Sequence, residues 1–320
     1  MSPAARGHEC RLHAARDEVA STRYALPVRF VTNPGSNLSD EEVREFDLFL
    51  TPQQIVVDGV YHDMRTKAPH ATVDAWVKTA KEHPFVLGSS AAECSDYFRQ
   101  IAGRDKGIVM LTTSRQLIGT YTAAVAAARS FAALHPDVNI DVVDTRSTDL
   151  GAGMTVLFAA EAARAGKPQR EVVALADRFA AAGKVMFHIP SLDYIVKGGR
   201  ASFLRAWVAD LLRVTPLLSF VNGELKAVGR VARSADPVVA IRDAIVQDVP
   251  AGRAVWLAVL NGGTPDAARL ADLLRRTYVV EREFVRPLSA SIYLHGGPRC
   301  MGAAVYPTDA LPWRPEPKPA

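Results

Sequence analysis

The stretch IVMLTTSRQLIGTYTAAVAAARSFAALHPDVNIDVVD, residues 108–144, decides the fold class. It opens with an apolar run of strand length, Ile108–Thr112, and closes with a second one, Ile140–Asp144. Between them, the alanine-rich segment Ile118–Leu134 predicts a helix that ends before Pro136, because a proline disfavours the helical conformation of the residue before it. Strand, helix and strand in this order predict a βαβ unit with parallel strands.

The same alternation of strands and helices extends towards the N-terminus. Val28–Val31 is an apolar run that predicts a first strand. Ser39 and Ser90 each stand three residues before a glutamate, a capping-box pattern that is typical of helix starts. We therefore expect an α/β domain over residues 27–165, with a mainly parallel sheet and flanking helices.

The chain beyond this domain predicts a second α/β domain, over residues 166–306, in which strands pair antiparallel. Asn222-Gly223 stands between two apolar runs, and this residue pair is typical of a two-residue hairpin turn. We also expect an amphipathic helix over Phe203–Arg213 and a strand over Ser291–His295. The predicted fold class is α/β with two domains and a ligand between them.

Both ends of the chain are expected to lie outside the two domains. Residues 1–26 lack the apolar segment of a secretory signal, so we expect a disordered or loosely packed extension there. Residues 307–320 contain five prolines. Proline lacks the backbone N–H that helices and sheet interiors use, so this segment predicts a proline-rich tail.

Composition excludes several classes of protein. The 320 residues are 48% hydrophobic and 22% charged, as in ordinary globular proteins. The net charge of +4 is spread along the chain, so we expect no nucleic-acid partner. No apolar run approaches the roughly 18 residues of a membrane span, and three cysteines without paired spacing indicate neither a disulfide framework nor a metal site. We expect a cytoplasmic protein with no cofactor, no metal and no integral membrane segment.

Two side chains are candidates for chemistry. Ser114 follows the strand Ile108–Thr112, and α/β proteins bind ligands at the carboxyl ends of parallel strands. The helix start behind it favours a carboxylate or phosphate, although Ser114 can equally be a plain helix cap. His295 runs into Gly296-Gly297, where a backbone can approach a ligand closely, although a buried structural histidine is the ordinary alternative.

Four elements of the sequence resemble those of the DegV family of bacterial fatty-acid-binding proteins, over about Val28 to Tyr306. They are Thr113–Tyr121, similar to the family's SSxLSGTY; Val143–Ser147, similar to its V-D-S/T strand end; Leu192–Arg200, similar to LxxLxxGGR, with the hairpin Leu217–Val231 after it; and His295–Gly302, similar to HxGPGxxG. Their order along the chain matches that of the family, which makes the resemblance specific.

Other positions depart from the family pattern. The family's T-S-Q-P-S element is replaced by Val86–Ser90, so that only Ser89 or Ser90 can supply the hydroxyl of its threonine. Its T-D-S element is replaced by Thr32-Asn33-Pro34. Arg115 stands in place of the second serine of SSxLSGTY, and its guanidinium is a candidate for the missing carboxylate donor.

The resemblance implies a binding protein rather than an enzyme. Such a protein encloses a single long-chain fatty acid in a buried apolar tunnel and presents its carboxylate to a partner kinase, which forms an acyl phosphate. The expected carboxylate ligands are Ser114, His295, Arg115, Ser89 and Ser90. The expected supporting loop residues are Gly119, Thr120 and Gly297, and Arg200 is expected to dock the kinase.

Two alternatives stay open at this point. One is a small-molecule phosphotransferase or hydrolase that uses Ser114 and His295 directly, which requires the two side chains within hydrogen-bond reach. The other is a lipid carrier or sensor without a kinase partner. The sequence leaves open the chain length and saturation of the lipid and the oligomeric state.

Overall fold

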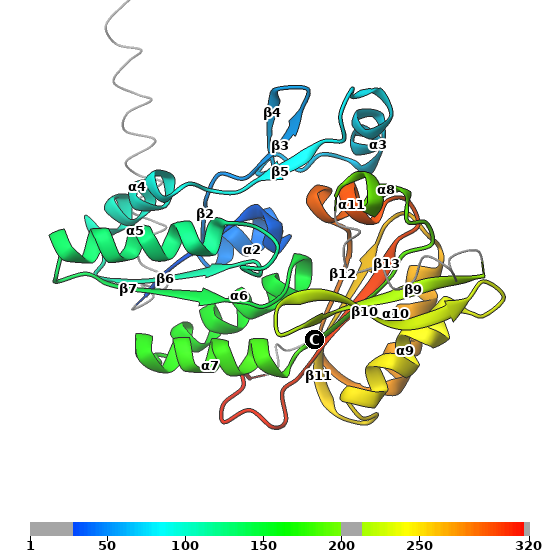
Figure 1. Ribbon diagram of the computed structural model, residues 1–320. Coiled ribbons are helices and arrows are strands. Elements are labelled where there is room, and N and C mark those ends of the chain that lie inside the picture. The colour runs from blue at the N-terminus through cyan, green and yellow to red at the C-terminus, as the bar shows by residue number, and fades with distance from the viewer. Residues whose placement is uncertain (1–27, 200–212, 317–320) are drawn as a thin grey trace, which may run out of the picture.

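The computed structural model describes residues 28–199 and 213–316, and three sheets organise them (Figure 1). The first sheet is parallel throughout, in the order β2-β1-β6-β7. Its strands are β1 (Arg29–Thr32), β2 (Phe49–Leu50), β6 (Gly107–Thr112) and β7 (Asn139–Asp144). The predicted βαβ unit is confirmed as the β6 and β7 strands with the helix between them.

Two pairs of helices cover this parallel sheet. They are α4 (Ala91–Ala102) and α5 (Thr120–Leu134) on one face, and α6 (Asp149–Arg164) and α7 (Gln169–Ala182) on the other. Successive side chains of a strand point to opposite faces. Val31 and Met110 therefore pack among α4 and α5, while Phe30 and Val109 belong to the core around α6.

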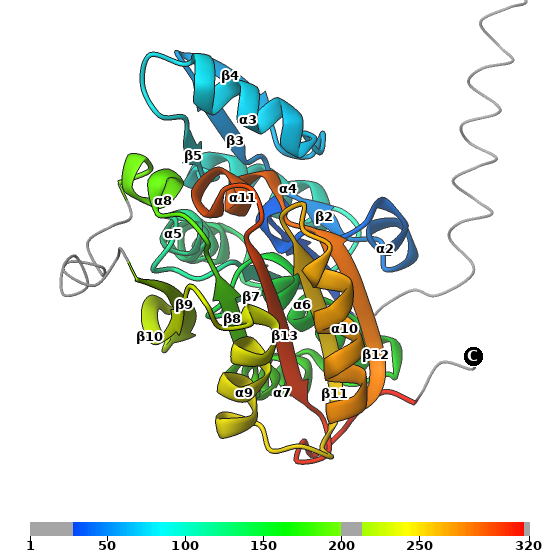
Figure 2. The same ribbon diagram turned by 90° about the vertical axis from the view of Figure 1, so that its right-hand side faces the viewer.

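The second sheet is mixed, in the order β10-β9-β8-β13-β11-β12, and only its β11–β12 pair is parallel. Its strands are β8 (Lys184–His188), β9 (Val214–Val221), β10 (Glu224–Ala232), β11 (Ala254–Asn261), β12 (Val279–Pro287) and β13 (Met301–Pro307). Helices α9 (Pro237–Asp248) and α10 (Asp266–Thr277) cover its outer face (Figure 2). The predicted α/β fold with a parallel sheet and an antiparallel hairpin is confirmed.

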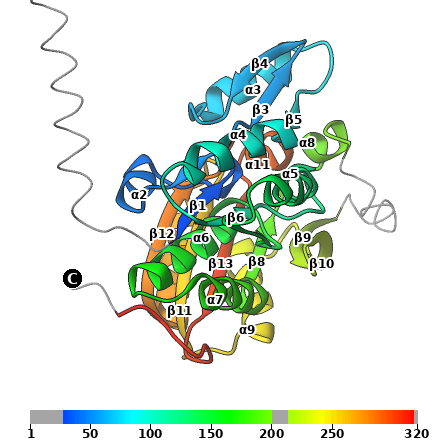
Figure 3. The same cartoon turned by 90° about the vertical axis from the view of Figure 1, so that its left-hand side faces the viewer.

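The main core lies between the two sheets, where α6 and α7 separate them (Figure 3). Phe158 of α6 stacks on Phe179 of α7 with ring centroids 4.3 Å apart. Trp256 of β11 meets both rings edge-on, at 5.6 and 5.4 Å. Burial of these aromatic side chains joins the layers into one apolar interior.

A third, smaller unit was not expected from the sequence. It consists of the antiparallel sheet β4-β3-β5 and one helix, with bounds β3 (Gln54–Val57), β4 (Val60–Asp63), α3 (His70–Thr79) and β5 (Phe85–Leu87). The short elements η1 (Pro34–Ser36), α2 (Asp40–Glu45), α8 (Asp193–Lys197) and α11 (Ala290–Gly296) complete the fold. Helix α3 of the small unit lies beside α8 and α11 (Figure 1).

Several local predictions are confirmed. Ser39 and Ser90 cap α2 and α4 with complete capping boxes. Asn222 and Gly223 form the β9–β10 turn with φ of 53° and 82°, the left-handed geometry that the Asn-Gly pair favours.

One local prediction is wrong, and a second differs from the structure only at its start. Ser291–His295 belongs to the helix α11 rather than to a strand, because a short apolar run does not distinguish the two by periodicity. The helix expected from Ile118 begins at Thr120.

Two further predictions fall outside the described residues: the extension over residues 1–26 and nearly all of the helix Phe203–Arg213. The division of the chain into two domains at residue 166 stays a prediction. At the other end, Pro307 is the last residue of β13, and Trp313 packs edge-on against Phe158 at 5.5 Å. Within the described ranges, no helix has the length and apolar character needed to cross a bilayer.

Candidate functional site

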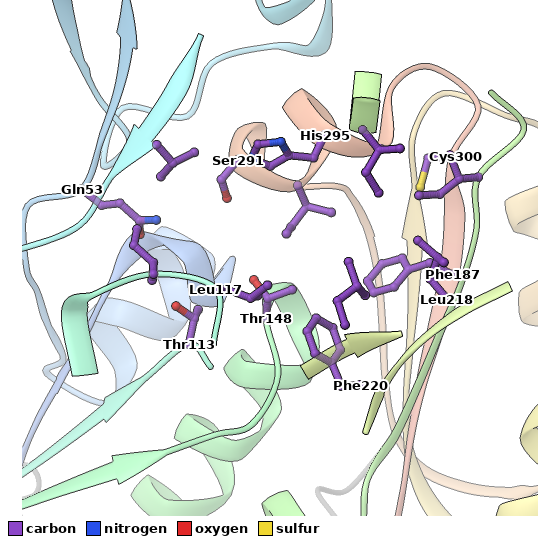
Figure 4. A pocket seen from close by; sticks show the side chains of 17 residues that line it. Gln53, Thr113, Leu117, Thr148, Phe187, Leu218, Phe220, Ser291, His295 and Cys300 are labelled. Atoms are coloured by element: carbon purple, nitrogen blue, oxygen red, sulfur yellow. The ribbon is translucent and has the colours of Figure 1, made fainter. Parts of the chain in front are cut away.

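A largely apolar pocket lies where the carboxyl edge of the parallel sheet faces the inner side of the second sheet (Figure 4). Its apolar wall consists of Val86, Leu117, Ile118, Phe187, Ile189, Ile195, Leu218, Phe220, Leu225, Ile292 and Cys300. Its polar lining consists of Gln53, Thr113, Thr148, Ser291 and His295. Figure 4 shows Gln53 and Thr113 on one side, Phe187, Leu218 and Phe220 on the other, and Thr148, Ser291 and His295 between them. We call the side with Gln53 and Thr113 the polar end of the pocket and the opposite side the apolar end.

Gln53 is oriented by donors that bind only its oxygen. Asn33 Nδ2 and the Gly35 N–H both donate to Gln53 Oε1, each at 2.9 Å. A backbone N–H must donate, so the amide oxygen of Gln53 faces Gly35. The amide nitrogen, which carries two further donors, is therefore turned towards the pocket (Figure 4).

Thr113 is held by the same asparagine. The Thr113 N–H donates to Asn33 Oδ1 at 3.0 Å, and Asn33 Nδ2 donates to Thr113 Oγ1 at 3.2 Å. Because the hydroxyl oxygen already accepts, its proton is available to a ligand. Asn33 stands where the family has a T-D-S element, and here it organises the polar end of the pocket.

The α11 helix brings two more polar side chains, and a buried carboxylate fixes where that helix begins. Asp149 accepts hydrogen bonds from Asn37 Nδ2 at 2.6 Å, from the Leu150 N–H at 2.9 Å and from the Ser289 N–H at 2.8 Å. Burial raises the pKa of Asp149, and these donors oppose that shift. Ser289 is the N-cap of α11, so Asp149 positions the helix that carries Ser291 and His295.

The other side of α11 is tied to the small unit through Asp74 of α3. The hydroxyl groups of Tyr194 and Tyr293 both donate to this carboxylate, at 2.8 and 3.1 Å. His70 stacks on the Tyr293 ring with centroids 3.8 Å apart. Burial, reinforced by Asp74, raises the pKa of Tyr194 to about 12, so its hydroxyl remains a donor at neutral pH.

His295 lines the pocket as predicted, and the glycines near it have packing roles. A Cβ at Gly198, just after α8, would lie 2.5 Å from His295 Nδ1, so this contact requires glycine. Gly297 ends α11 with a φ of 72°, and any side chain there would meet the Tyr194 ring. The His295 ring also lies 6.3 Å from that of His83, a residue that sequence reasoning did not select.

Ser114 does not line the pocket. Its buried hydroxyl donates to the Gly223 carbonyl at 2.5 Å and accepts from the Gln116 N–H at 3.2 Å. It is not a helix cap either, because Gly119 occupies the N-cap position of α5. Ser114 thus anchors the β9–β10 hairpin to the parallel sheet, a long-range role that no local pattern indicates.

The other three expected carboxylate ligands also lie away from the pocket lining. Ser89 Oγ donates to the Pro52 carbonyl at 2.6 Å and lies 2.8 Å from Thr51 Oγ1, and Ser90 is the N-cap of α4. The Arg115 side chain is more than half exposed and lies 3.5 Å from Asp144 in an ion pair. The structure therefore brings only His295 of the five expected ligands to the pocket.

Of the expected supporting residues, Gly119 caps α5 and Thr120 is its first residue, with a buried hydroxyl. Arg200, expected to dock a partner, lies outside the described residues. Sequence reasoning missed Gln53, Thr113, Thr148 and Ser291, and the only available signal was that Thr113 adjoins Ser114.

Two nucleophilic side chains near the pocket, Cys300 and Ser114, are buried. Burial raises the pKa of the Cys300 thiol to about 12, so the thiol remains protonated and acts as part of the apolar wall. The enzymatic alternative requires Ser114 and His295 within hydrogen-bond reach of each other, but the Ser114 hydroxyl donates to the Gly223 carbonyl. Within the described part of the chain, no three histidine, cysteine or acidic side chains form a group that could hold a metal ion.

Comparisons with known proteins give the context of this site. The family model described as an uncharacterised protein, DegV family, matches residues 27–308. A DegV domain-containing protein of Streptomyces coelicolor is 36% identical over 215 residues, which cover 66% of this chain and 74% of that protein. A fatty acid-binding protein of Thermotoga maritima is 28% identical, over 88% of this chain and 98% of its own.

A solved structure shows the same architecture. A fatty-acid-binding DegV family protein from Thermus thermophilus superimposes with a TM-score of 0.80 at 25% identity, over 88% of this chain and 99% of that one. Two of these three relatives are named for fatty-acid binding, and none of the three names describes an enzymatic reaction.

Proposed function

The chain belongs to the DegV family, and from this premise we propose that it binds one long-chain fatty acid in the pocket between its two main sheets. In this proposal the carboxylate lies at the polar end, among Gln53, Thr113, Ser291 and His295, and the acyl chain runs along the apolar wall. The observation that carries the proposal is an otherwise apolar pocket in which the donors of Gln53 and Thr113 lie opposite Phe187, Leu218 and Phe220 (Figure 4).

The energetics of such a ligand match both ends of the pocket. Each buried methylene contributes about 0.8 kcal/mol, so a 16-carbon chain supplies on the order of 10 kcal/mol before ordering costs. Burial of an unpaired carboxylate costs several kcal/mol, which hydrogen-bond donors must offset. Three neutral groups are donors of this kind: the amide nitrogen of Gln53 and the hydroxyls of Thr113 and Ser291.

A ligand assay tests the proposal directly. Delipidated protein is expected to bind one palmitate or oleate per chain in native mass spectrometry, and saturating fatty acid should raise the melting temperature. Hexadecanol keeps the chain but lacks the carboxylate, and it should bind more weakly. No stoichiometric complex with any long-chain fatty acid would refute the proposal.

We further propose that a kinase acts on the bound acid in the cytoplasm, while the protein itself remains the binding component. One observation supports this: Gly198 of the LxxLxxGGR-like segment packs on His295, so the described part of this segment lies beside the pocket. Docking of the kinase is the role that the family resemblance implies for the segment. With ATP and a DegV-associated kinase, the loaded protein should yield acyl phosphate. Binding without acyl-phosphate formation would favour the alternative of a lipid carrier or sensor.

A further inference from the structure

The apolar end of the pocket is closed by one side chain that it shares with a second cavity. This second cavity has a volume of about 300 Å³ and is lined by Arg146, Gly183, Val185 and Tyr306, among others. Among the described residues, Phe220 is the only one that lines both spaces. Its ring therefore forms the partition between the two spaces.

The position of this partition is fixed from both sides. The Phe220 ring meets Phe187 of the neighbouring strand edge-on at 6.5 Å, and Leu225 of β10 is its cross-strand partner. Two residues further along, the β9–β10 turn is tied to the parallel sheet by the bond from Ser114 to the Gly223 carbonyl. The hairpin cannot swing away from the pocket without breaking that bond.

A bound fatty acid would meet this ring with its methyl end. A carboxylate at Gln53 and Thr113 directs the acyl chain towards Phe187, Leu218 and Phe220, which lie on the opposite side of the pocket (Figure 4). Beyond Phe220, Ala180, Val185 and Tyr306 supply the apolar surface of the second cavity. Its polar lining consists of Ser147, Asn222 and the ion pair of Arg146 with Asp177. Space for additional methylenes exists there, and the Phe220 ring blocks access to it.

We propose that Phe220 sets the upper limit of the acyl chain length that this protein accepts. This inference rests on the proposed function, because it requires a fatty acid in the pocket. Each additional buried methylene strengthens binding about fourfold, so affinity should rise with chain length until the methyl end reaches the ring, and should then fall. Replacement of the ring by a smaller side chain joins the two cavities and moves this optimum upward.

The test is a chain-length series of saturated acids, from 12 to 22 carbons, titrated into delipidated parent protein and three variants. Phe220→Ala should move the optimum upward by about two carbons or more, and Phe220→Trp should move it downward. Phe284→Ala is the matched control, because Phe284 is also a half-buried strand residue of the second sheet but lines neither cavity. Its optimum should equal that of the parent.

The possible results distinguish a failure of the chain-length limit from a failure of fatty-acid binding itself. An unchanged optimum in Phe220→Ala and Phe220→Trp, with all chain lengths weakened equally, overturns the inference and leaves fatty-acid binding intact. Absence of binding by the parent overturns the proposed function, and the inference with it. If Phe220→Ala does not fold, the Trp variant alone decides, because a downward shift supports the limit and an unchanged optimum contradicts it.

Discussion

The two ends of the pocket are built in different ways. The polar end is assembled from side chains far apart in the sequence, and Asn33 and Asp149 hold them through buried hydrogen bonds. The apolar end consists of neighbouring residues on paired strands, such as Leu218 and Phe220 of β9. The polar end therefore depends on a few directional contacts, while the apolar end depends on strand pairing and on side-chain volume.

The first prediction tests whether one buried carboxylate supports the polar end. Asp149→Ala should lower the free energy of unfolding by about 4 kcal/mol, because the half-buried amide of Asn37 and the buried N–H of Ser289 lose their acceptor and alanine is strained at a φ of 53°. Asp149→Asn tolerates that φ and should be less destabilising. Urea unfolding measures both.

The control for this prediction is a carboxylate of similar chemistry at the surface. Asp177 pairs with Arg146, and its side chain is about half exposed. Asp177→Ala should change the unfolding free energy by less than about 1 kcal/mol. Equal losses in the variants of Asp149 and Asp177 would show that the buried contacts around Asp149 are not what holds the polar end together.

The second prediction concerns a buried histidine in the second sheet. Burial lowers the pKa of His188 to about 4, and its Nε2 lies 2.8 Å from Thr215 Oγ1. The unfolded chain binds a proton near pH 6.5 while the folded protein does not, so stability is full above pH 6.5 and falls as the pH drops towards 4. The His188 contribution should reach about 3 kcal/mol.

The control is His188→Gln, which cannot titrate. Unfolding curves at pH 7.5, 6, 5 and 4.5 should show a smaller loss in this variant than in the parent. Some dependence will remain, because burial also lowers the pKa of His83 in the same direction. Parallel curves for the parent and His188→Gln would contradict the assignment.

The third prediction tests the donor that faces the polar end. Gln53→Leu keeps the approximate size of the side chain but removes the amide nitrogen, so palmitate affinity should fall by about 30-fold, as expected for loss of about 2 kcal/mol from a hydrogen bond to a charged group. The affinity for hexadecanol, which has no carboxylate, should change much less. Isothermal titration with the two ligands compares the ends of the pocket within one variant.

The fourth prediction has the smallest expected effect. Arg115 pairs with Asp144 at the surface, so Arg115→Ser should change palmitate affinity by less than about twofold between pH 6 and pH 8. The sequence makes this guanidinium a candidate ligand of the carboxylate. A steep loss of affinity in Arg115→Ser would show that Arg115 binds the carboxylate and that the polar end described above does not.

The two ends of the pocket also differ in how far the sequence predicts them. Strand and hairpin patterns predicted β9 and β10, because their signals are local. The contact of Ser114 with Gly223 joins positions 109 residues apart, and the contacts of Asn33 with Gln53 and Thr113 likewise arise only from tertiary packing. The family resemblance selected a histidine that lines the pocket, but it could not show that Thr113 rather than the neighbouring Ser114 lines it.

The most direct test follows the carboxyl carbon of [1-13C]palmitate by NMR in the protein-bound state. We expect one bound resonance that shifts in Gln53→Leu and stays unchanged in Arg115→Ser, because only the first side chain lies at the polar end of the pocket. A resonance that shifts in Arg115→Ser and stays unchanged in Gln53→Leu would show that the carboxylate does not lie beside Gln53.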